Sequence, residues 1–241
     1  MGKKSGRGKL KRISAPKQWN IPRKEGRFVT KPSPGSHSIE NCYSLAVVLR
    51  DLLGVVSSHK ETVSVLNRGD VLVDGSPRRD PGFPVGLFDV VSVPKEGKSY
   101  RLVPSPDGLV PVEVVSTEAG MKLCRVRSKV KTAGGHIQFG FHDGRSLLDD
   151  KLAAACGDTI VMKVPVQKVV DSVKLAKGST GLVVSGERAG QVGRIISVKK
   201  GTSTREKMVS LSLPSGETEL PERLIFAVGN EKPALEVQVR A

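Results

Sequence analysis

Large aromatic side chains are scarce in this sequence. Its 241 residues include one tryptophan, two tyrosines and six phenylalanines, although 38% of all residues are hydrophobic. Such a composition can fill small cores but supplies few bulky rings for one large interior. We therefore expect two or three small modules rather than a single compact domain.

Cysteine is also rare, and long hydrophobic runs are missing. Cys42, Cys124 and Cys156 are odd in number and lack CxxC spacing. The sequence therefore predicts neither a disulfide framework nor a zinc site, which is typical of a reducing compartment. No apolar segment approaches the length of a membrane span, and none follows the basic start as it would in a secretion signal. We expect a soluble, cytoplasmic protein with no membrane partner.

Acidic residues are outnumbered, and the imbalance is uneven along the chain. The sequence has 39 Lys and Arg against 24 Asp and Glu, a formal net charge of +15. Residues 1–35 hold 11 of these basic residues and a single acid, Glu25, whereas residues 41–94 hold five basic and six acidic residues. Such a charge requires an anionic partner, and it is concentrated where the chain begins.

Residues 1–40 are rich in Lys, Arg, Pro, Gly and Ser and show no apolar periodicity. We expect them to form a tail that stays disordered until a partner binds, since they cannot bury enough surface to offset the entropy of ordering. A solubilising leader or a nuclear import signal is the alternative to nucleic-acid binding. Trp19 favours nucleic acid, because a lone indole among cations can stack on a base, although it can also anchor the tail in a crevice.

Two short helices are expected next. Apolar residues between 45 and 53 recur with helical spacing, and Gly54 follows as a natural C-terminal stop. Ser58 and Glu61 have the spacing of a capping box and predict a second helix, which should end at Gly69. The pair at 74 and 75, Asp-Gly, then predicts a tight hairpin turn between two strands.

The remaining sequence is predicted to be entirely β. Segments 100–103 and 109–115 flank the turn signal SPDG and form a hairpin, and a later strand places Ile137, Phe139 and Phe141 on one side. From residue 171, two valine-rich segments flank a turn between residues 186 and 190. Strands this short and tightly turned predict a small SH3-like barrel.

One predicted strand, LCRVRSKVKT at 123–132, alternates cations with mostly apolar residues. Since alternate side chains of a strand face opposite sides, its cations should form one row. We favour a phosphate-binding surface, because four cations with no acid between them repel one another. A solvated face, or an edge strand protected by lysine, is the alternative. The row consists of Arg125, Arg127, Lys129 and Lys131.

Signatures of enzymes and of metal sites are weak. EGKS at 96–99 lacks the first glycine of a phosphate-binding loop, because Ser92 stands in its place. The glycines between 186 and 193 lack dinucleotide-binding spacing. His136 and His142 have no nearby cysteine and no HExxH motif, so we expect polar or RNA-contacting side chains rather than metal ligands. We therefore expect no catalytic residue, no cofactor, no metal ion and no small-molecule substrate.

The order of the motifs resembles that of one protein family. LKRISAPKQW at 10–19, RGDVLVDGSPRRD at 68–80, KLCRVRSKV at 122–130, HDGRSL at 142–147 and SGERAGQVGRI at 185–195 are similar to motifs of the archaeal and eukaryotic small-subunit ribosomal protein family S4e. The resemblance covers nearly the whole chain and implies an α+β, mostly β fold. It implies a basic RNA-binding tail at 1–40, a two-helix RNA-binding domain of the S4 type at 41–94, a central β domain at 95–170, a KOW SH3-like domain at 171–215 and a C-terminal β extension at 216–241.

The resemblance also implies a structural constituent of the small ribosomal subunit that supports translation. Its partners would be small-subunit ribosomal RNA and neighbouring ribosomal proteins. An RNA-modifying enzyme with an appended two-helix RNA-binding domain, and a KOW-type transcription or translation factor that binds transiently, are the alternatives. The expected RNA-binding residues are Lys11, Arg12, Lys17, Trp19, Arg23, Lys24, Arg68, Arg78, Arg79, Arg125, Arg127, Lys129, Lys131, Arg145, Arg188 and Arg194.

Overall fold

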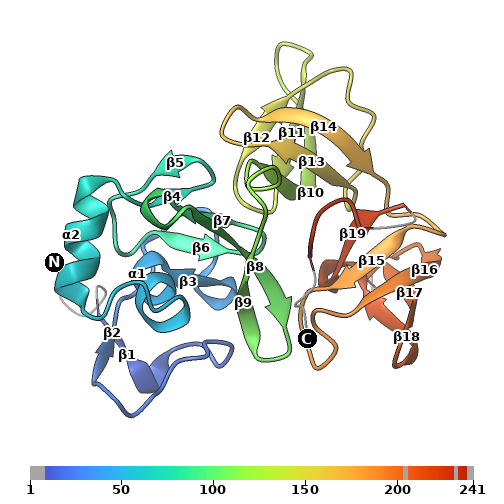
Figure 1. Ribbon diagram of the computed structural model, residues 1–241. Helices are drawn as coiled ribbons and strands as arrows, with labels where there is room; N and C mark the ends of the chain where they lie inside the picture. Colours follow the sequence, from blue (N-terminus) through green and yellow to red (C-terminus); the bar gives the residue numbers. More distant parts are fainter. Residues whose placement is uncertain (1–8, 203–205, 231–232, 238–241) are drawn as a thin grey trace, which may run out of the picture.

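Three five-stranded antiparallel sheets form most of the computed structural model, which describes residues 9–202, 206–230 and 233–237. The sheets follow one another along the chain, and two further pairs of short strands lie near its start (Figure 1). The few helical turns lie mostly in the first 70 residues. The predicted fold class, α+β and mostly β, is confirmed.

The two predicted helices are present. The first begins as α1 (Leu45–Val47) and continues as a wider π-helical turn, η3 (Val48–Leu52). The second, α2 (His59–Arg68), is capped by the Ser58 side chain, which accepts a hydrogen bond from the N–H of residue 61 at 3.2 Å. It ends at Gly69, whose φ of +79° is the left-handed conformation of a helix stop. Single 3-10 turns occupy η1 (Arg12–Ser14), η2 (Ile39–Asn41), η4 (Pro94–Glu96) and η5 (Glu222–Leu224).

The first sheet extends beyond the predicted domain boundary at 94. Its hairpin turn at Asp74 and Gly75 has φ values of +51° and +73°, as a two-residue turn of this kind requires. The hairpin of residues 98–113 hydrogen-bonds to β7, so it belongs to this sheet and not to the central one. The strands, in the order β5-β4-β7-β8-β9, are β4 (Leu72–Val73), β5 (Ser76–Pro77), β7 (Val90–Val93), β8 (Lys98–Ser105) and β9 (Gly108–Glu113); β3 (Cys42–Ser44) and β6 (Pro84–Gly86) pair beside it.

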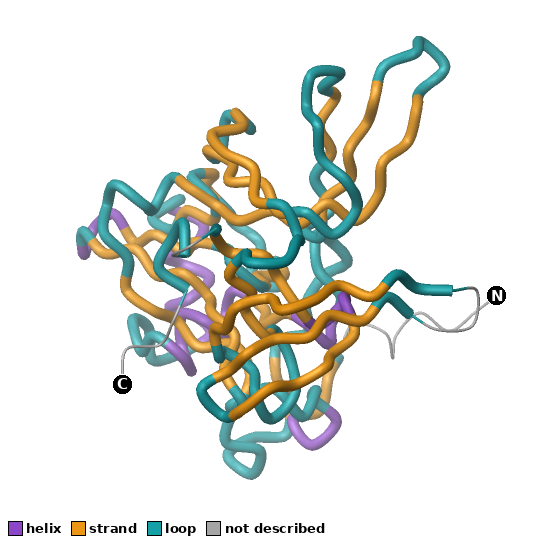
Figure 2. Tube along the Cα trace, turned by 90° about the vertical axis from the view of Figure 1, so that its right-hand side faces the viewer, coloured by secondary structure: helices purple, strands orange, loops and turns teal. Residues whose placement is uncertain are grey.

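The central sheet stands at the top of the molecule, where its hairpins project away from the rest (Figures 1 and 2). Ile137, Phe139 and Phe141 belong to its own apolar core, as the sequence pattern predicts. The order is β12-β11-β10-β13-β14. The strands are β10 (Met121–Lys131), β11 (Ile137–Phe141), β12 (Ser146–Leu148), β13 (Thr159–Lys163) and β14 (Lys168–Val173).

The third sheet contains the predicted pair of valine-rich strands around the turn at 186–190. Its order is β18-β17-β16-β15-β19, so the expected extension at 216–241 contributes two strands to the same sheet rather than forming a separate unit. The third module therefore does not end at 215. Its strands are β15 (Thr180–Val183), β16 (Val192–Lys199), β17 (Met208–Leu213), β18 (Gly216–Pro221) and β19 (Ile225–Gly229).

Residues 9–40 are folded, so the prediction of a disordered tail is wrong for this part; residues 1–8 lie outside the described residues. β1 (Leu10–Lys11) pairs with β2 (Phe28–Val29). Trp19 is only 3% exposed, its ring lies 5.4 Å from that of Tyr43, and its indole N–H donates to the carbonyl of Cys42 at 2.8 Å. The segment has few apolar side chains at irregular spacing, but they join the core of the first module, where periodicity is not needed.

The three sheets share an apolar core where they meet. Phe88, beside the first sheet, packs edge to face against Phe226 of β19 with ring centroids 5.1 Å apart. Leu123 of β10 belongs to the same cluster. The modules are therefore packed against one another, and side chains from different modules can build one site.

Candidate nucleic-acid interface

The exposed cations of the N-terminal segment are the first component of the candidate interface. Lys11, Lys17 and Lys24 are exposed, and none of them pairs with an acidic side chain of the described residues. The backbone that carries them is held in place by the buried Trp19. These three lysines remain candidate RNA contacts, and they now stand on a folded scaffold.

The two arginines expected beside them have another role. Arg12 is buried and donates to the carbonyl of Pro22 at 2.6 Å. Arg23 donates to the carbonyls of Ala15 and Pro16 at 3.0 and 2.9 Å. Both guanidinium groups donate to backbone carbonyls within the N-terminal segment itself, so neither arginine remains a candidate RNA contact. Trp19 is removed for the same reason, since a buried indole that donates to backbone cannot stack on a base; its alternative role as an anchor is confirmed.

The predicted row of four cations does not form, because a β-bulge interrupts β10. Val126 lies opposite Phe141 on β11, but Ser128 lies opposite the next residue, Gly140, so Arg127 has no partner there. Directly opposed residues share a face, and one extra residue reverses the alternation beyond it. Lys129, opposite Phe139, therefore falls on the same side of the sheet as Val126.

Contacts on the two sides of the bulge differ accordingly. Arg125 donates to the carbonyls of residues 222, 223 and 225 and lies 4.9 Å from the ring of Phe226, so it joins the central and third sheets. Burial lowers the pKa of this guanidinium. The ammonium group of Lys129 donates to the carbonyl of Ala154 at 3.1 Å. Arg127, Lys129 and Lys131 are all exposed, and they remain candidates, although the ammonium of Lys129 is partly engaged by this carbonyl.

The basic residues of the first hairpin are only partly available. Arg68 pairs with Asp70 at 3.2 Å, and Arg78 lies over the ring of Phe83 at 4.5 Å. Arg79 is exposed. In the third sheet, Arg188 is half-buried, whereas Arg194 is exposed and donates from Nε to the carbonyl of residue 178 at 3.2 Å.

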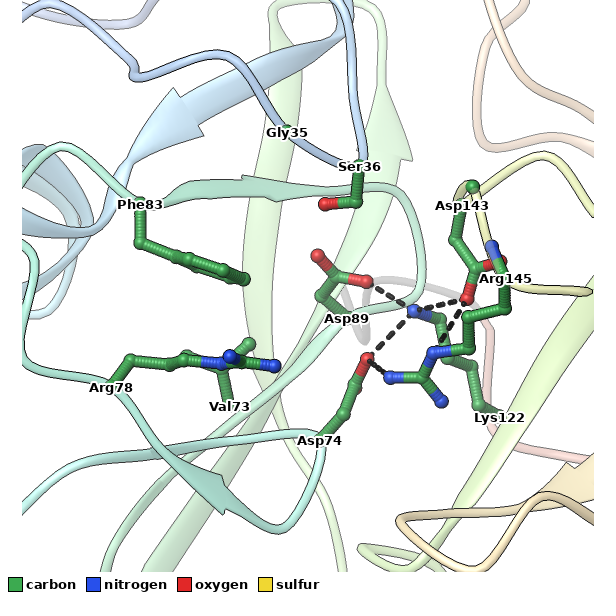
Figure 3. Close-up of a pocket in the computed structure, with 11 residues that line it drawn as sticks. Gly35, Ser36, Val73, Asp74, Arg78, Phe83, Asp89, Lys122, Asp143 and Arg145 are labelled. Atoms are coloured by element: carbon green, nitrogen blue, oxygen red, sulfur yellow. Dashed lines mark hydrogen bonds and ion pairs between the residues drawn. The ribbon is translucent and has the colours of Figure 1, made fainter.

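A buried network of charges joins the first and central sheets. Lys122 of β10 is 1% exposed, and its ammonium group contacts three carboxylates (Figure 3). Asp74, in the hairpin turn, lies 2.8 Å away and Asp143, after β11, lies 3.0 Å away, while Asp89 is also in direct contact. Arg145 bridges Asp74 and Asp143 at 2.6 and 3.3 Å. Since its guanidinium is engaged internally, we remove Arg145 from the candidate contacts.

The protonation states of this network follow from burial and from charge. Burial alone would lower the pKa of Lys122, but the surrounding carboxylates outweigh it and raise that pKa above its usual range. Burial alone would raise the pKa of Asp89, but Lys122 and His37, whose Nε2 lies 3.0 Å from this carboxylate, hold it below the usual range. Asp74 differs: burial, together with repulsion from Asp89, raises its pKa. The ammonium of Lys122 is therefore the cation that all three carboxylates share, and Arg145 adds a second positive charge beside Asp74 and Asp143.

His142 is a half-buried, neutral side chain with both ring nitrogens hydrogen-bonded within the protein. Its Nδ1 accepts a hydrogen bond from the backbone N–H of Arg125 at 3.2 Å, so Nε2 is the nitrogen that carries the proton. Burial, with the nearby ammonium of Lys122, lowers the pKa of His142 to about 3. It is therefore not available for RNA. The other histidine considered, His136, is exposed and contacts Asp150 at 2.7 Å.

Sequence reasoning missed the residues of the buried network. Lys122 immediately precedes the apolar pair at 123 and 124, and a lysine so placed at the inner end of a strand is a weak signal for a buried ion pair. Its three carboxylate partners lie 48, 33 and 21 positions away in the chain, and nothing in their local pattern brings them together.

The surface of the described residues offers little for catalysis. A cavity of about 310 Å³ opens onto the charge network, but its carboxylates pair with Lys122 and Arg145, and the remaining cation in its lining, Arg78, lies over the ring of Phe83. The described ranges contain no group of three His, Cys, Asp or Glu side chains that could hold a metal ion. Among the described helices, none has the length and apolarity needed to cross a membrane.

Comparisons with known proteins give a consistent result. Family models described as "Ribosomal family S4e" and "RS4NT (NUC023) domain" match residues 96–169 and 4–40. The small ribosomal subunit protein eS4 of Methanocella arvoryzae is 37% identical over 230 residues, which is 94% of this chain and 96% of that protein. The protein of the same name from Methanosphaera stadtmanae is 36% identical over 236 residues, 98% of each chain. The crystal structure of the 30S ribosomal protein S4e from Thermoplasma acidophilum superimposes with a TM-score of 0.67 at 30% identity, covering 79% of this chain and 96% of that one.

Proposed function

The chain belongs to the ribosomal family S4e of small-subunit proteins, and on that premise we propose that it binds small-subunit ribosomal RNA through the exposed cations of its N-terminal segment. A constituent of the small ribosomal subunit is a structural component of the translation machinery, not an enzyme. Such a protein acts by binding its partners, and it is located in the small ribosomal subunit in the cytoplasm. The observation that carries the proposal is the presentation of Lys11, Lys17 and Lys24 on a folded segment with no acidic partner among the described residues.

Exposed lysines without acidic partners are suited to phosphates. Each lysine that neutralises a phosphate releases condensed counterions from the RNA, which supplies much of the binding free energy. A folded segment also loses less conformational entropy on binding than a disordered one. The buried Trp19 and the two inward arginines thus support RNA binding indirectly, because they fix where the exposed lysines lie.

A second contact region is expected on the central sheet. Arg127 bulges out of β10, and Lys131 lies at the end of the strand beside the projecting loop. Phosphate contacts at two separate surfaces would fix the orientation of the protein on the folded RNA. Arg79 and Arg194 remain further candidates, because both are exposed.

Neighbouring ribosomal proteins are the other expected class of partner. Val130 and Leu148 are 57% and 63% exposed and lie on one face of the central sheet, because both are opposite Gln138. An exposed apolar row of this kind is suited to contact with protein rather than with phosphate.

Charge reversal tests the proposal. The variant K11E/K17E/K24E should fail to sediment with small subunits in a high-salt sucrose gradient, because three acids would face phosphates. K163E/K168E/K174E is the matched control, since it changes the net charge equally at exposed lysines of the central module. The control should sediment as the wild type does. Equal losses in both variants would show that only net charge matters, and wild-type protein that washes off in high salt would indicate a transiently bound factor.

A further inference from the structure

Phe28 is the exposed aromatic residue of this protein. Its side chain belongs to β2 and is 48% exposed, whereas the other aromatic side chains, all within the described residues, are buried or half-buried. A ring that faces water in a chain with so few aromatic residues indicates a binding surface, since an exposed ring contributes little to the core.

The register of the N-terminal hairpin explains why this ring points outward. Leu10 lies opposite Val29, and Lys11 lies opposite Phe28. Val29 is buried in the first core, and Leu10 packs against that core. Because successive residues of a strand face opposite sides, Lys11 and Phe28 share the outer face of the hairpin.

Cations surround the ring. The ammonium of Lys9 lies over the ring at 5.9 Å from its centroid, and the guanidinium carbon of Arg27 lies over it at 5.3 Å. Both side chains are exposed, so each is free to turn from the ring to a phosphate when a base takes its place. Lys11 is exposed on the same face. An aromatic ring flanked by positive charges is the arrangement that single-stranded RNA requires, because a base can stack on the ring while adjacent phosphates meet the cations.

We propose that Phe28 is a stacking platform for an unpaired RNA base, with the flanking phosphates held by Lys9, Lys11 and Arg27. This inference rests on the proposed function and makes it more specific. The lysines elsewhere in the segment bind phosphates of any sequence, whereas the ring selects a place where a base is free of pairing. Base stacking, which the sequence suggested for Trp19, is thus assigned to Phe28.

The test compares Phe28→Leu and Phe28→Trp in the full-length protein. The probe is protein-free small-subunit ribosomal RNA, and affinity is measured by filter binding over a range of salt concentrations. Leucine keeps an apolar side chain but has no ring, so affinity should fall by roughly 5- to 150-fold, the value of one base stacked on an aromatic side chain. The salt slope should not change, because no cation is removed. Tryptophan should preserve the affinity, since the indole also stacks on bases.

Two controls separate this inference from its premise. Val166→Ala removes another exposed apolar side chain, in the central module, and should bind as the wild type does. Thermal melting of Phe28→Leu should match that of the wild type, because the ring is outside the core.

The outcomes are distinguishable. Wild-type protein that does not bind the RNA would overturn both the proposed function and the platform. Wild-type binding with unchanged affinity in Phe28→Leu would overturn the platform alone. If that variant binds RNA normally but enters subunits poorly, the ring contacts a neighbouring protein, and the platform is again overturned.

Discussion

Lys122 holds together parts of the chain that are distant in sequence. Its ammonium contacts a carboxylate in the first hairpin turn, one beside β7 and one beyond β11. Buried ion pairs of this kind often stabilise a protein little, because desolvation of the charges offsets their attraction. Removal of one partner is different, since it leaves the other charges buried without compensation. The network therefore acts mainly to define how the first and central sheets meet.

The first prediction at the residue scale concerns this ammonium. Lys122→Met should lower the free energy of unfolding by about 3–5 kcal/mol, because three buried carboxylates lose the cation that they share and Arg145 contacts only two of them. Urea denaturation at pH 7 measures the loss. Lys163→Met is the matched control at the exposed end of β13 and should cost less than about 0.5 kcal/mol.

The same variant should also change how stability depends on pH. In the wild type the pKa of Asp89 lies below its usual range, so its stabilisation is present above about pH 4 and is lost as the pH falls further. Without Lys122, only His37 still lowers the pKa of Asp89, so burial should raise that pKa from its wild-type position. The wild type itself loses stability over this range, because folded His142, whose pKa is lowered to about 3, stays neutral where the unfolded histidine binds a proton. Relative to the wild type, Lys122→Met should therefore gain stability as the pH falls from 7 towards 5. Parallel pH profiles for the two proteins would contradict the assigned role of Lys122.

At the scale of elements, the bulge in β10 determines which side chains face solvent. An uninterrupted strand would place Val126 and Val130 on the same buried side. In the structure Val126 is 1% exposed and Val130 is 57% exposed, because Arg127 is the extra residue between them. The unpaired Arg127 thus separates Arg125, which contacts the third sheet, from Lys129 and Lys131, which are exposed to solvent.

Paired substitutions test the bulge. Val126→Asp should unfold the protein or lower its melting temperature sharply, because an unpaired carboxylate would enter the core. Val130→Asp should change the free energy of unfolding by no more than about 0.5 kcal/mol, as is usual at the surface. Similar large losses for both variants in thermal melts would mean that the strand is regular and the bulge is absent.

At the scale of the whole molecule, the sequence predicts local structure better than assembly. The cap at Ser58, the stop at Gly69 and the turn at Asp74 and Gly75 are short-range signals, and the structure confirms each of them. The order of the modules was also recognisable from motifs. Features that depend on distant partners were not predictable in the same way.

Three such features show why. The sequence left open whether Trp19 stacks on a base or anchors the segment, because the crevice that holds it is built by residues more than 20 positions away. The bulge at Arg127 depends on the register with β11, which a single strand does not reveal. Phe28 carries no local signal beyond the cations beside it, and its outward direction comes from pairing with β1. Candidate contacts could be named from charge, but exposure depends on the packed structure.

The salt dependence of ribosomal RNA affinity tests the central claim most directly, for the wild type and for K11A/K17A/K24A. If the three lysines each neutralise a phosphate, the slope of log affinity against log salt should be shallower by about 2 to 3 in the variant. Thermal melting should be unchanged, since the three side chains are exposed. Equal slopes for the two proteins would contradict the account, because they would mean that these lysines do not touch the RNA backbone.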